Sequence, residues 1–103
     1  MRTLADALQE SADAAEAHDY AKALELLVWI HDNPNPADPS SEMFRRAYGF
    51  LAFGVLAGVY EPAKAKLIEL VTAKRAQVAA GLADDATKAD LRALEARLRD
   101  SEA

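Results

Sequence analysis

Apolar residues recur at intervals of three and four along most of the chain, which is the spacing of one face of an α-helix. The first such segment runs from Thr3 to about Ala17, with alanine at most apolar positions and acidic residues between them. Thr3 followed by Asp6 predicts a capping box at its start. Because alanine buries little area, we expect this helix to depend on packing against a neighbour.

A second helix is predicted from Asp19, a good N-cap, to about His31. It is apolar almost all round, which indicates a central element buried on more than one side, and we assign Trp29 to the core. Residues 32–40 follow with three prolines, and this composition predicts a loop.

A third helix is predicted from Ser40 or Ser41 to about Val59. Residues 47–60 contain no charged residue, but this run is shorter than the about 20 apolar residues that a membrane span needs. We therefore expect a buried core helix and no membrane partner. Three glycines within residues 49–58 predict that another helix crosses closely here.

A fourth helix begins near Pro62, which suits a first helical turn, and ends before Gly81, a natural C-cap. A fifth helix is predicted from Ala86 to about Asp100. Its leucine stripe is narrow and flanked by charges, as is typical of a capping helix that packs along one edge. The chain, residues 1–103, is therefore predicted to be one all-α domain of about five helices.

Shifting the sequence by 40 residues aligns the second helix with the fourth. The aligned pairs are Tyr20 with Tyr60, Ala23 with Ala63, Leu27 with Leu67, Val28 with Ile68 and Ile30 with Leu70. Each half thus consists of a helix, a tight turn, a tyrosine and a helix. One supersecondary unit is used twice.

Residues 18–24 read His-Asp-Tyr-Ala-Lys-Ala-Leu, residues 58–63 read Gly-Val-Tyr-Glu-Pro-Ala, and residues 33–35 read Asn-Pro-Asn. Over about residues 4–75 the chain resembles the tetratricopeptide repeat family, with its Gly-Asp-Tyr-x-x-Ala-Leu turn and Pro-Asn exit. The repeats are degenerate: their spacing is 40 residues, where the family has about 34. The family's Trp and Leu-Gly signature is missing, since Ala7, Glu10 and Ser11 stand in its place.

Residues 29–32, the proline-rich loop and residues 60–63 are also similar to small bacterial helical-repeat proteins. Neither resemblance carries an assigned activity.

The tetratricopeptide resemblance implies two antiparallel helix hairpins in a right-handed array, closed by a C-terminal capping helix. We assign unit 1 to residues 3–33, the loop to 34–40, unit 2 to 41–81 and the capping helix to 84–101. Two units leave apolar surface uncovered, because about three are generally needed. We therefore expect a homodimer, formed through the alanine-rich first helix or the glycine-bearing third helix.

The net charge of −5 is unevenly spread. Residues 1–43 hold nine acids against two basic residues, and residues 44–103 hold ten basic residues against eight acids. The asymmetry either reflects solvated helix faces or steers a basic partner. An acidic chain without a basic face repels phosphate backbones, so we expect no nucleic-acid partner.

The sequence has no cysteine, which excludes disulfides, a thiolate nucleophile and a zinc finger. Acidic residues stand near the N-terminus where a signal peptide needs an apolar run, so we expect a cytoplasmic protein.

His18 and His31 are the two histidines, each followed by aspartate. They stand at opposite ends of one helix and lie about 20 Å apart, too far to share a metal ion. His18 is interpreted as a turn residue and His31 as a partner of its helix's C-terminal dipole. The sequence holds no nucleophile–base pair and no phosphate-binding glycine loop, so we expect no catalysis, no metal and no cofactor.

Arg45, Arg46 and Tyr48 are the candidate partner-binding residues. The resemblance places Arg45 and Tyr48 on the inner, peptide-contacting face of the second unit, and both residue types are common in binding hot spots. The alternative is structural: Tyr48 fills the core with its aromatic neighbours, and Arg45 pairs with Asp38 or Glu42.

These observations favour a non-enzymatic protein–protein interaction module that binds a protein or peptide partner, or associates with itself. A second hypothesis is a small toxin-neutralising, immunity-like inhibitor whose acidic N-terminal half covers a basic target. A third is a helical-bundle enzyme or ligand-binding protein.

Overall fold

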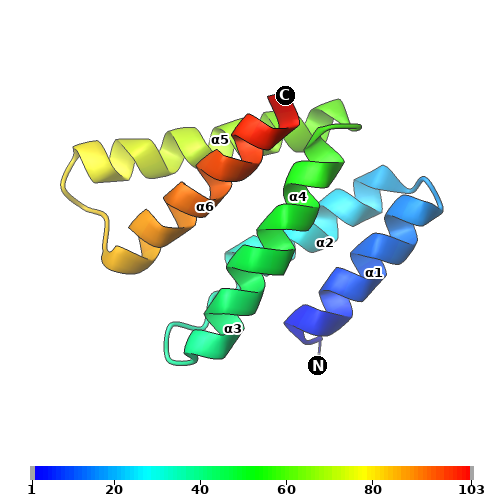
Figure 1. Cartoon of the computed structure of the whole chain (residues 1–103), viewed down its shortest axis with the longest axis horizontal. Coiled ribbons are helices and arrows are strands. Elements are labelled where there is room, and N and C mark those ends of the chain that lie inside the picture. The colour runs from blue at the N-terminus through cyan, green and yellow to red at the C-terminus, as the bar shows by residue number, and fades with distance from the viewer. Residues whose placement is uncertain (1, 103) are drawn as a thin grey trace.

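The computed structural model describes residues 2–102, and every regular element among them is a helix (Figure 1). The elements are α1 (Leu4–Glu16), α2 (Tyr20–Asp32), α3 (Pro39–Phe44), the π-helical turn η1 (Arg45–Gly49), α4 (Phe50–Ala57), α5 (Glu61–Ala79) and α6 (Asp85–Glu102). We call α3, η1 and α4 together the central rod, because they follow one another without a break. The all-α prediction with about five helices is confirmed. Among the described residues, no helix combines the length and apolar character needed to cross a membrane.

The starts of the first three helices follow local capping chemistry. Thr3 Oγ1 accepts a hydrogen bond from the Asp6 N–H at 3.0 Å, and the Asp6 carboxylate accepts one from the Thr3 N–H, as the predicted capping box requires. Asp19 caps α2, also as predicted. The central rod starts earlier than predicted, because Asp38 caps it in place of a serine and Pro39 suits its first turn. The preceding loop therefore ends at Asp38.

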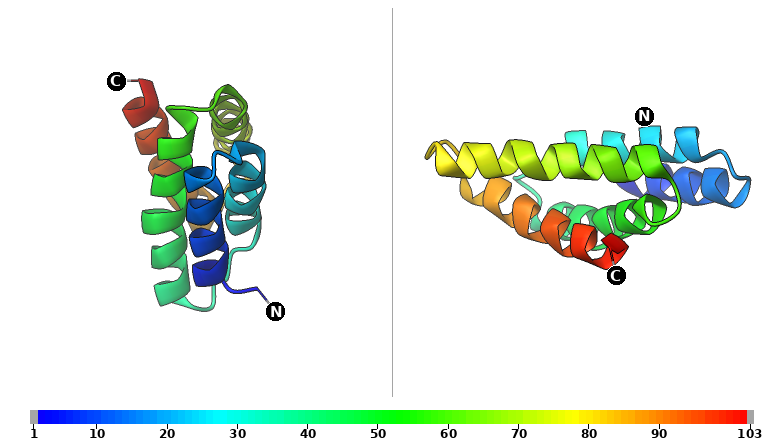
Figure 2. Two further views of the ribbon diagram at one scale, coloured as in Figure 1. Left: turned by 90° about the vertical axis from the view of Figure 1, so that its right-hand side faces the viewer. Right: turned by 90° about the horizontal axis from the view of Figure 1, so that it is seen from above.

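The helices form two layers (Figure 2). One layer holds α1, the central rod and α6, and the other holds α2 and α5. Within this arrangement α1 pairs with α2, α2 packs on the rod, and the rod packs on both α5 and α6. The molecule is correspondingly flat, with extents of 42 × 31 × 18 Å. The rod is the element that joins the N-terminal helix pair to the C-terminal one.

The two halves place their repeated residues alike. Tyr20 begins α2 and Tyr60 caps α5, and their rings meet with centroids 5.6 Å apart. Ala23 and Ala63 are both buried, where a small side chain lets the paired helices approach. The turns differ, because His18 has a φ of +61°, a conformation that costs a non-glycine residue about 1 kcal/mol or more.

One face of the central rod is buried and the other is not. Phe50 and Phe53 are completely buried in the core. Leu51 and Val55 on the outward side are 43% and 66% exposed, and Val59 in the turn after α4 is 67% exposed. The prediction of a core helix is therefore right for one face and wrong for the other, because none of the described helices covers the outward face.

The π-helical turn explains how the rod changes its inward face. In η1 the Phe50 N–H donates to the Arg45 carbonyl, five residues earlier, instead of to the residue four earlier. Buried positions step from Glu42 to Arg45 and Gly49, the first and last residues of this turn, and continue at Phe50 directly after it. The extra residue thus turns the second half of the rod, so that Phe50 points inward and Leu51 outward.

The glycines of the rod lie where helices of the same chain cross it. A Cβ built on Gly49 would stand 2.7 Å from Ile30 Cγ2 of α2, and one on Gly54 would stand 3.0 Å from Arg97 Cβ of α6. The predicted close crossings are therefore present. At Gly49 and Gly54 helices of the same chain already cover the surface of the rod. The prediction that a homodimer forms through these two glycines is therefore wrong.

We predict that Gly49→Ala destabilises the protein by about 1–2 kcal/mol. Overpacking a rigid β-branched neighbour such as Ile30 costs about 1–3 kcal/mol, and the better helix propensity of alanine returns only part of it. Gly58→Ala is the matched control, because the nearest atom to its Cβ is the Val55 carbonyl oxygen, at an ordinary contact distance of 3.4 Å. Urea denaturation followed by circular dichroism should separate the two variants, and equal stabilities would refute the packing argument.

Candidate functional site

Arg45 lies in the core, with 1% of its surface exposed. Its Nε donates to the Ile30 carbonyl at 3.1 Å, and its Nη2 donates to the His31 carbonyl at 2.7 Å. Both carbonyls belong to the last turn of α2, where backbone acceptors lack partners within the helix. Arg45 therefore caps α2 from the central rod, and the prediction that it contacts a partner at the surface is wrong.

The same guanidinium binds Asp90 on α6. Its Nη1 and Nη2 donate to the two carboxylate oxygens at 2.9 and 2.7 Å, and such two-pronged pairs are among the stronger hydrogen-bonded contacts in proteins. Arg46 Nε adds a third bond to Asp90 at 2.8 Å. Glu42 Oε1 lies 3.6 Å from Arg45 Nη1 and 3.3 Å from Arg46 Nη2. Of the two structural partners predicted for Arg45, Asp38 and Glu42, it therefore pairs with Glu42. Two arginines and two carboxylates thus form a charge-balanced cluster.

The pKa of Asp90 reflects two opposed effects. Burial alone would raise the pKa of this carboxyl, but the hydrogen bonds from Arg45 and then Arg46 lower it, and the result is a pKa below the ordinary value. Asp90 therefore stays ionised at neutral pH, and its charge is matched to the arginines within the cluster.

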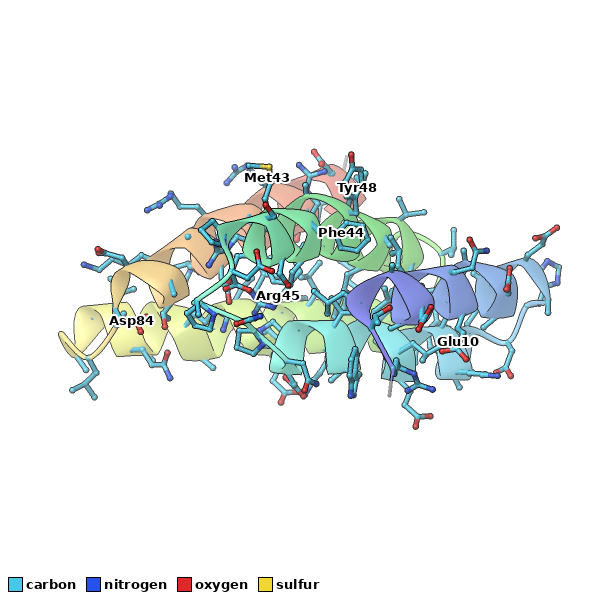
Figure 3. All side chains as sticks on the ribbon, turned by 90° about the horizontal axis from the view of Figure 1, so that it is seen from below. Glu10, Met43, Phe44, Arg45, Tyr48 and Asp84 are labelled. Atoms are coloured by element: carbon cyan, nitrogen blue, oxygen red, sulfur yellow. The ribbon has the colours of Figure 1, made fainter. Side chains whose placement is uncertain are left out.

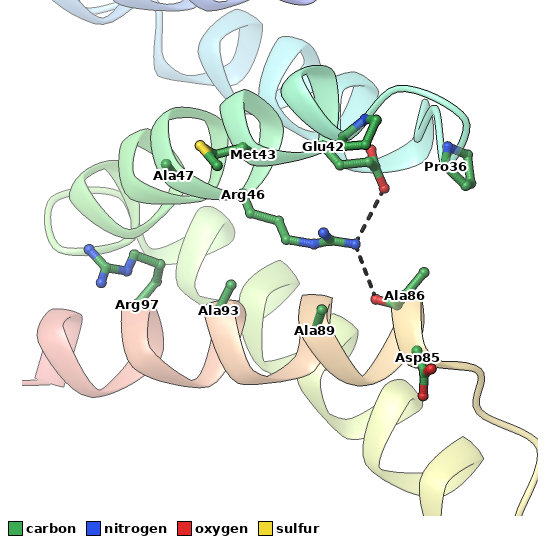
Figure 4. Close-up of a pocket in the computed structure, with 11 residues that line it drawn as sticks. Pro36, Glu42, Met43, Arg46, Ala47, Asp85, Ala86, Ala89, Ala93 and Arg97 are labelled. Carbon is green, nitrogen blue, oxygen red and sulfur yellow. Dashed lines mark hydrogen bonds and ion pairs between the residues drawn. The ribbon is translucent and has the colours of Figure 1, made fainter.

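Arg46 lines a groove of about 870 Å³ between the central rod and α6 (Figure 4). Its side chain crosses from the rod toward the start of α6, where Nη2 lies 3.4 Å from the Ala86 carbonyl as donor. Since the guanidinium already binds Asp90 and Glu42, little of its hydrogen-bonding capacity is left for an anionic ligand. We therefore interpret Arg46 as a residue that holds α6 to the rod.

Tyr48 lies on the surface, 57% exposed, with its ring 5.3 Å from that of Phe44. It points away from the molecule, whereas Arg45 points into it (Figure 3). The three predicted site residues thus occupy three environments: the core, the half-buried edge of an ion-pair cluster, and the surface. They do not form one site.

Tyr48 instead borders an apolar groove of about 490 Å³ that runs between α1 and the rod, with α2 as its floor. Its lining residues are Leu8, Ser11, Ala12, Ala15, Tyr20, Ala23, Leu27, Tyr48, Leu51, Ala52, Val55, Leu56 and Val59. None of them is charged, and the Ser11 hydroxyl already donates to the Leu8 carbonyl at 2.7 Å.

Four residues form the exposed wall of this groove, and we call Tyr48, Leu51, Val55 and Val59 the rod stripe. The sequence analysis names Tyr48 as a candidate partner-binding residue, but it misses Leu51, Val55 and Val59, because the uncharged run as a whole predicts a core helix. The signal was available in the spacing: these positions follow one another at three, four and four residues. That spacing is a second helical face beside the one that carries Phe50 and Phe53.

His31 is a core residue. Its ring packs against Phe50 with centroids 5.9 Å apart, and Nδ1 lies 2.8 Å from Asp32 Oδ1. Its buried Nε2 has no hydrogen-bond partner among the described residues. Burial lowers the pKa of the imidazole, the Asp32 hydrogen bond opposes this, and the positive charge of Lys74 lowers the pKa further, so that it lies below the ordinary value.

His31 does not lie near a metal-binding cluster. Residues 2–102 contain no group of three or more His, Cys, Asp or Glu side chains arranged to hold a metal ion. His18, at the other end of α2, is exposed and stacks on Tyr20.

We predict that Asp90→Ala lowers the free energy of unfolding by about 3–5 kcal/mol, because Arg45 is left buried without its counter-charge. Glu95→Ala is the control on the same helix: it removes a pair with Arg75, whose side chain is 59% exposed, and should cost about 1 kcal/mol or less. Denaturant unfolding measures both. Similar losses of unfolding free energy in the two variants would show that the buried ion pair stabilises the protein no more than the exposed one.

We also predict that lowering the pH below about 6.5 destabilises the protein through His31. The folded-state pKa lies below that of the unfolded chain, so the unfolded chain takes up its proton first and stability falls as the pH drops toward the folded pKa. Asp90 contributes to acid sensitivity only below about pH 4.

The measurement is the free energy of unfolding between about pH 7.5 and about pH 5, the range in which an imidazole of this kind titrates. His31→Phe should flatten the profile, whereas His18→Asn, a change at the exposed histidine, should leave the slope in place. A slope that survives His31→Phe would contradict this assignment.

No family model, no curated protein and no solved structure matches the chain. A function is therefore argued from the site alone. The arginine cluster is satisfied internally, whereas the groove between α1 and the rod exposes apolar side chains that none of the described elements covers. This groove is the candidate functional site.

Proposed function

We propose that the protein is a non-enzymatic interaction module that binds a protein or peptide in the groove between α1 and the central rod. One observation carries the proposal: the rod stripe aligns four large apolar side chains, each at least 43% exposed, along one wall of an apolar groove. Contiguous apolar surface of this kind in a folded protein marks an interaction site more often than a chance distribution of side chains.

The composition of the groove supports binding over catalysis. Proton transfer or nucleophilic attack needs a positioned acid, base or nucleophile. None of the lining residues is Asp, Glu, His, Lys or Cys, and the Ser11 hydroxyl already donates to the Leu8 carbonyl. Its open shape supports a macromolecular occupant over a small molecule. Sites for small ligands usually enclose most of the ligand surface, whereas the Val55 and Val59 side chains here stand mostly in water.

Of the three candidate partner-binding residues, Tyr48 keeps that role in the proposal. Its exposed ring, supported by Phe44, offers a large apolar area with a polar tip at one end of the rod stripe. Arg45 and Arg46 act indirectly, because their cluster fixes the rod against α2 and α6.

The arrangement of layers is consistent with the tetratricopeptide-like interpretation, which remains part of the proposal. The first helix of each pair, α1 and the rod, lies in one layer together with α6, and the second helices lie in the other (Figure 2). In such an array the groove between successive first helices is open to a partner.

We predict that peptides selected from a random display library on the wild-type protein lose at least about tenfold in affinity on Val55→Asp. A charge in the middle of the rod stripe has to be desolvated when the groove is filled. Val78→Asp is the matched control, since Val78 is an exposed valine on α5 outside the groove. Fluorescence anisotropy measures both affinities.

Circular dichroism should first confirm that both variants fold, as expected for substitutions at exposed positions. Selected peptides that bind Val55→Asp as tightly as the wild type would contradict the proposed function, as would a selection that yields no binder above background.

A further inference from the structure

We infer that the segment bound in this groove is an amphipathic helix with lysine or arginine beside its apolar face. The inference rests on the proposed function of the groove and adds the chemical class of the partner. Three features carry it: the lack of hydrogen-bonding groups in the groove, its length, and the acidic edge on α1.

The groove offers almost nothing to the backbone of an extended peptide. Its walls are helices, whose backbone N–H and C=O groups are already paired along their length, and its side chains are almost all hydrocarbon. Ser11 is buried and its hydroxyl is used by Leu8. An extended strand would therefore bury unpaired backbone groups, at about 1–3 kcal/mol each. A helix satisfies its own backbone, so it can present a purely apolar face.

The rod stripe suits a helix of at least two turns. From Tyr48 to Val55 the rod advances by about 10 Å at 1.5 Å per residue, and Val59 follows in the turn after α4. A helical partner lays apolar residues at positions i, i+3 or i+4, and i+7 into a groove of this kind. Its anchors would fall between the rod stripe and the alanines of α1, Ala12 and Ala15, which leave room for larger side chains.

The edge of the groove on α1 carries an acidic residue. Leu8 and Ala12 line the groove, and Glu16 continues their row at the same four-residue step, next to the groove-lining Ala15. The Glu16 carboxylate is exposed and forms no ion pair among the described residues. A lysine or arginine flanking the apolar face of the bound helix would meet this charge.

The wider charge distribution agrees with a basic partner. Residues 2–32, which hold the α1–α2 pair, contain seven acids against Arg2 and Lys22, a balance of −5. The rod contributes no positive charge along its exposed stripe, because residues 47–60 are uncharged. A field of one sign around an apolar groove speeds the encounter with a segment of the opposite sign and disfavours segments of the same sign.

The same charges argue against a second copy of this chain as the occupant. A symmetric pairing places the same patch of each copy in one interface, so two acidic α1 edges would meet there. The chain carries basic residues on α6, but α6 already uses its apolar face: Leu91 and Leu94 are buried within the chain. The groove is therefore better suited to another protein.

The test uses three fluorescently labelled synthetic peptides of about four turns, or about 21 Å of helix, long enough to reach beyond the helical part of the rod stripe. Their apolar residues are leucines at helical spacing; one peptide has flanking lysines, the second has glutamates at the same positions, and the third is the lysine peptide with its sequence scrambled. We expect the lysine peptide to bind at least about tenfold more tightly than the glutamate peptide, and its affinity to fall as salt is raised. The scrambled peptide should not bind, because its leucines no longer share one face.

Two variants localise the charge effect. Glu16→Lys should weaken binding of the lysine peptide by about fivefold, since a favourable charge contact becomes repulsive. The control is Glu25→Lys, which makes the same change of charge on α2 at an exposed position that does not line the groove, and it should weaken binding much less. Val55→Asp should remove binding of the lysine peptide.

The outcomes separate this inference from the proposed function. Equal binding of the lysine and glutamate peptides, both lost on Val55→Asp, would overturn the basic partner and leave the groove as a docking site. Absence of binding by either helical peptide would overturn the amphipathic-helix inference, while library-selected peptides could still occupy the groove. Binding that survives Val55→Asp would contradict both, and a wild-type dimer in sedimentation that Val55→Asp dissociates would make a second copy the occupant.

Discussion

The buried ion pair between Arg45 and Asp90 is the contact on which the arrangement of helices depends. It joins residues 45 positions apart, and through the carbonyls of Ile30 and His31 the same guanidinium also closes the end of α2. One side chain thus connects α2, the central rod and α6. Removing two charges from water costs several kcal/mol per ion, and only good geometry and further hydrogen bonds offset that cost. Here four donor contacts from Arg45 supply them.

This cluster determines what remains available at the surface. Asp90 holds Arg45 and Arg46 on the side of α6, where their charges are neutralised by nearby carboxylates. The π-helical turn lies in the same stretch of the rod, and its extra residue places Arg45 and Phe50 inward within little more than one turn. The second half of the rod then exposes Leu51 and Val55 to solvent, and the turn after it exposes Val59. The buried ion pair and the exposed apolar stripe therefore lie on opposite sides of the same segment of the chain.

The acidic surface and the apolar groove lie together because of how the two helix pairs meet. Ala12 and Ala15 of α1 have short side chains on the groove side, so the space between α1 and the rod stays open as a channel instead of being filled. The exposed carboxylate of Glu16, one helical step beyond Ala12, then stands at the outer edge of the channel. A helix rich in small and acidic residues thus serves both to pack on α2 and to frame a surface that favours apolar and basic chemistry.

The sequence by itself determined the helices and most of their ends, because helical periodicity and capping act within a few residues. The capping box at Thr3, the N-cap at Asp19 and the turn at Gly81, whose φ is +73°, needed no knowledge of the fold. The glycines also predicted the close helix crossings correctly, because glycine inside a helix is expected where a neighbouring helix leaves no room for a side chain.

Tertiary structure alone decided which face of each helix meets a neighbour. A helical arginine has the same sequence pattern whether it faces solvent or a carboxylate 45 residues away. The sequence therefore predicts Arg45 at the surface, whereas Asp90 holds it in the core. An uncharged apolar run has the same sequence pattern whether one or both of its faces are covered, so the sequence predicts core positions for Leu51, Val55 and Val59, which the structure exposes. The π-helical turn adds to this difficulty. Its extra residue rotates every later position of the helix about the axis, and the local sequence pattern gives no sign of it.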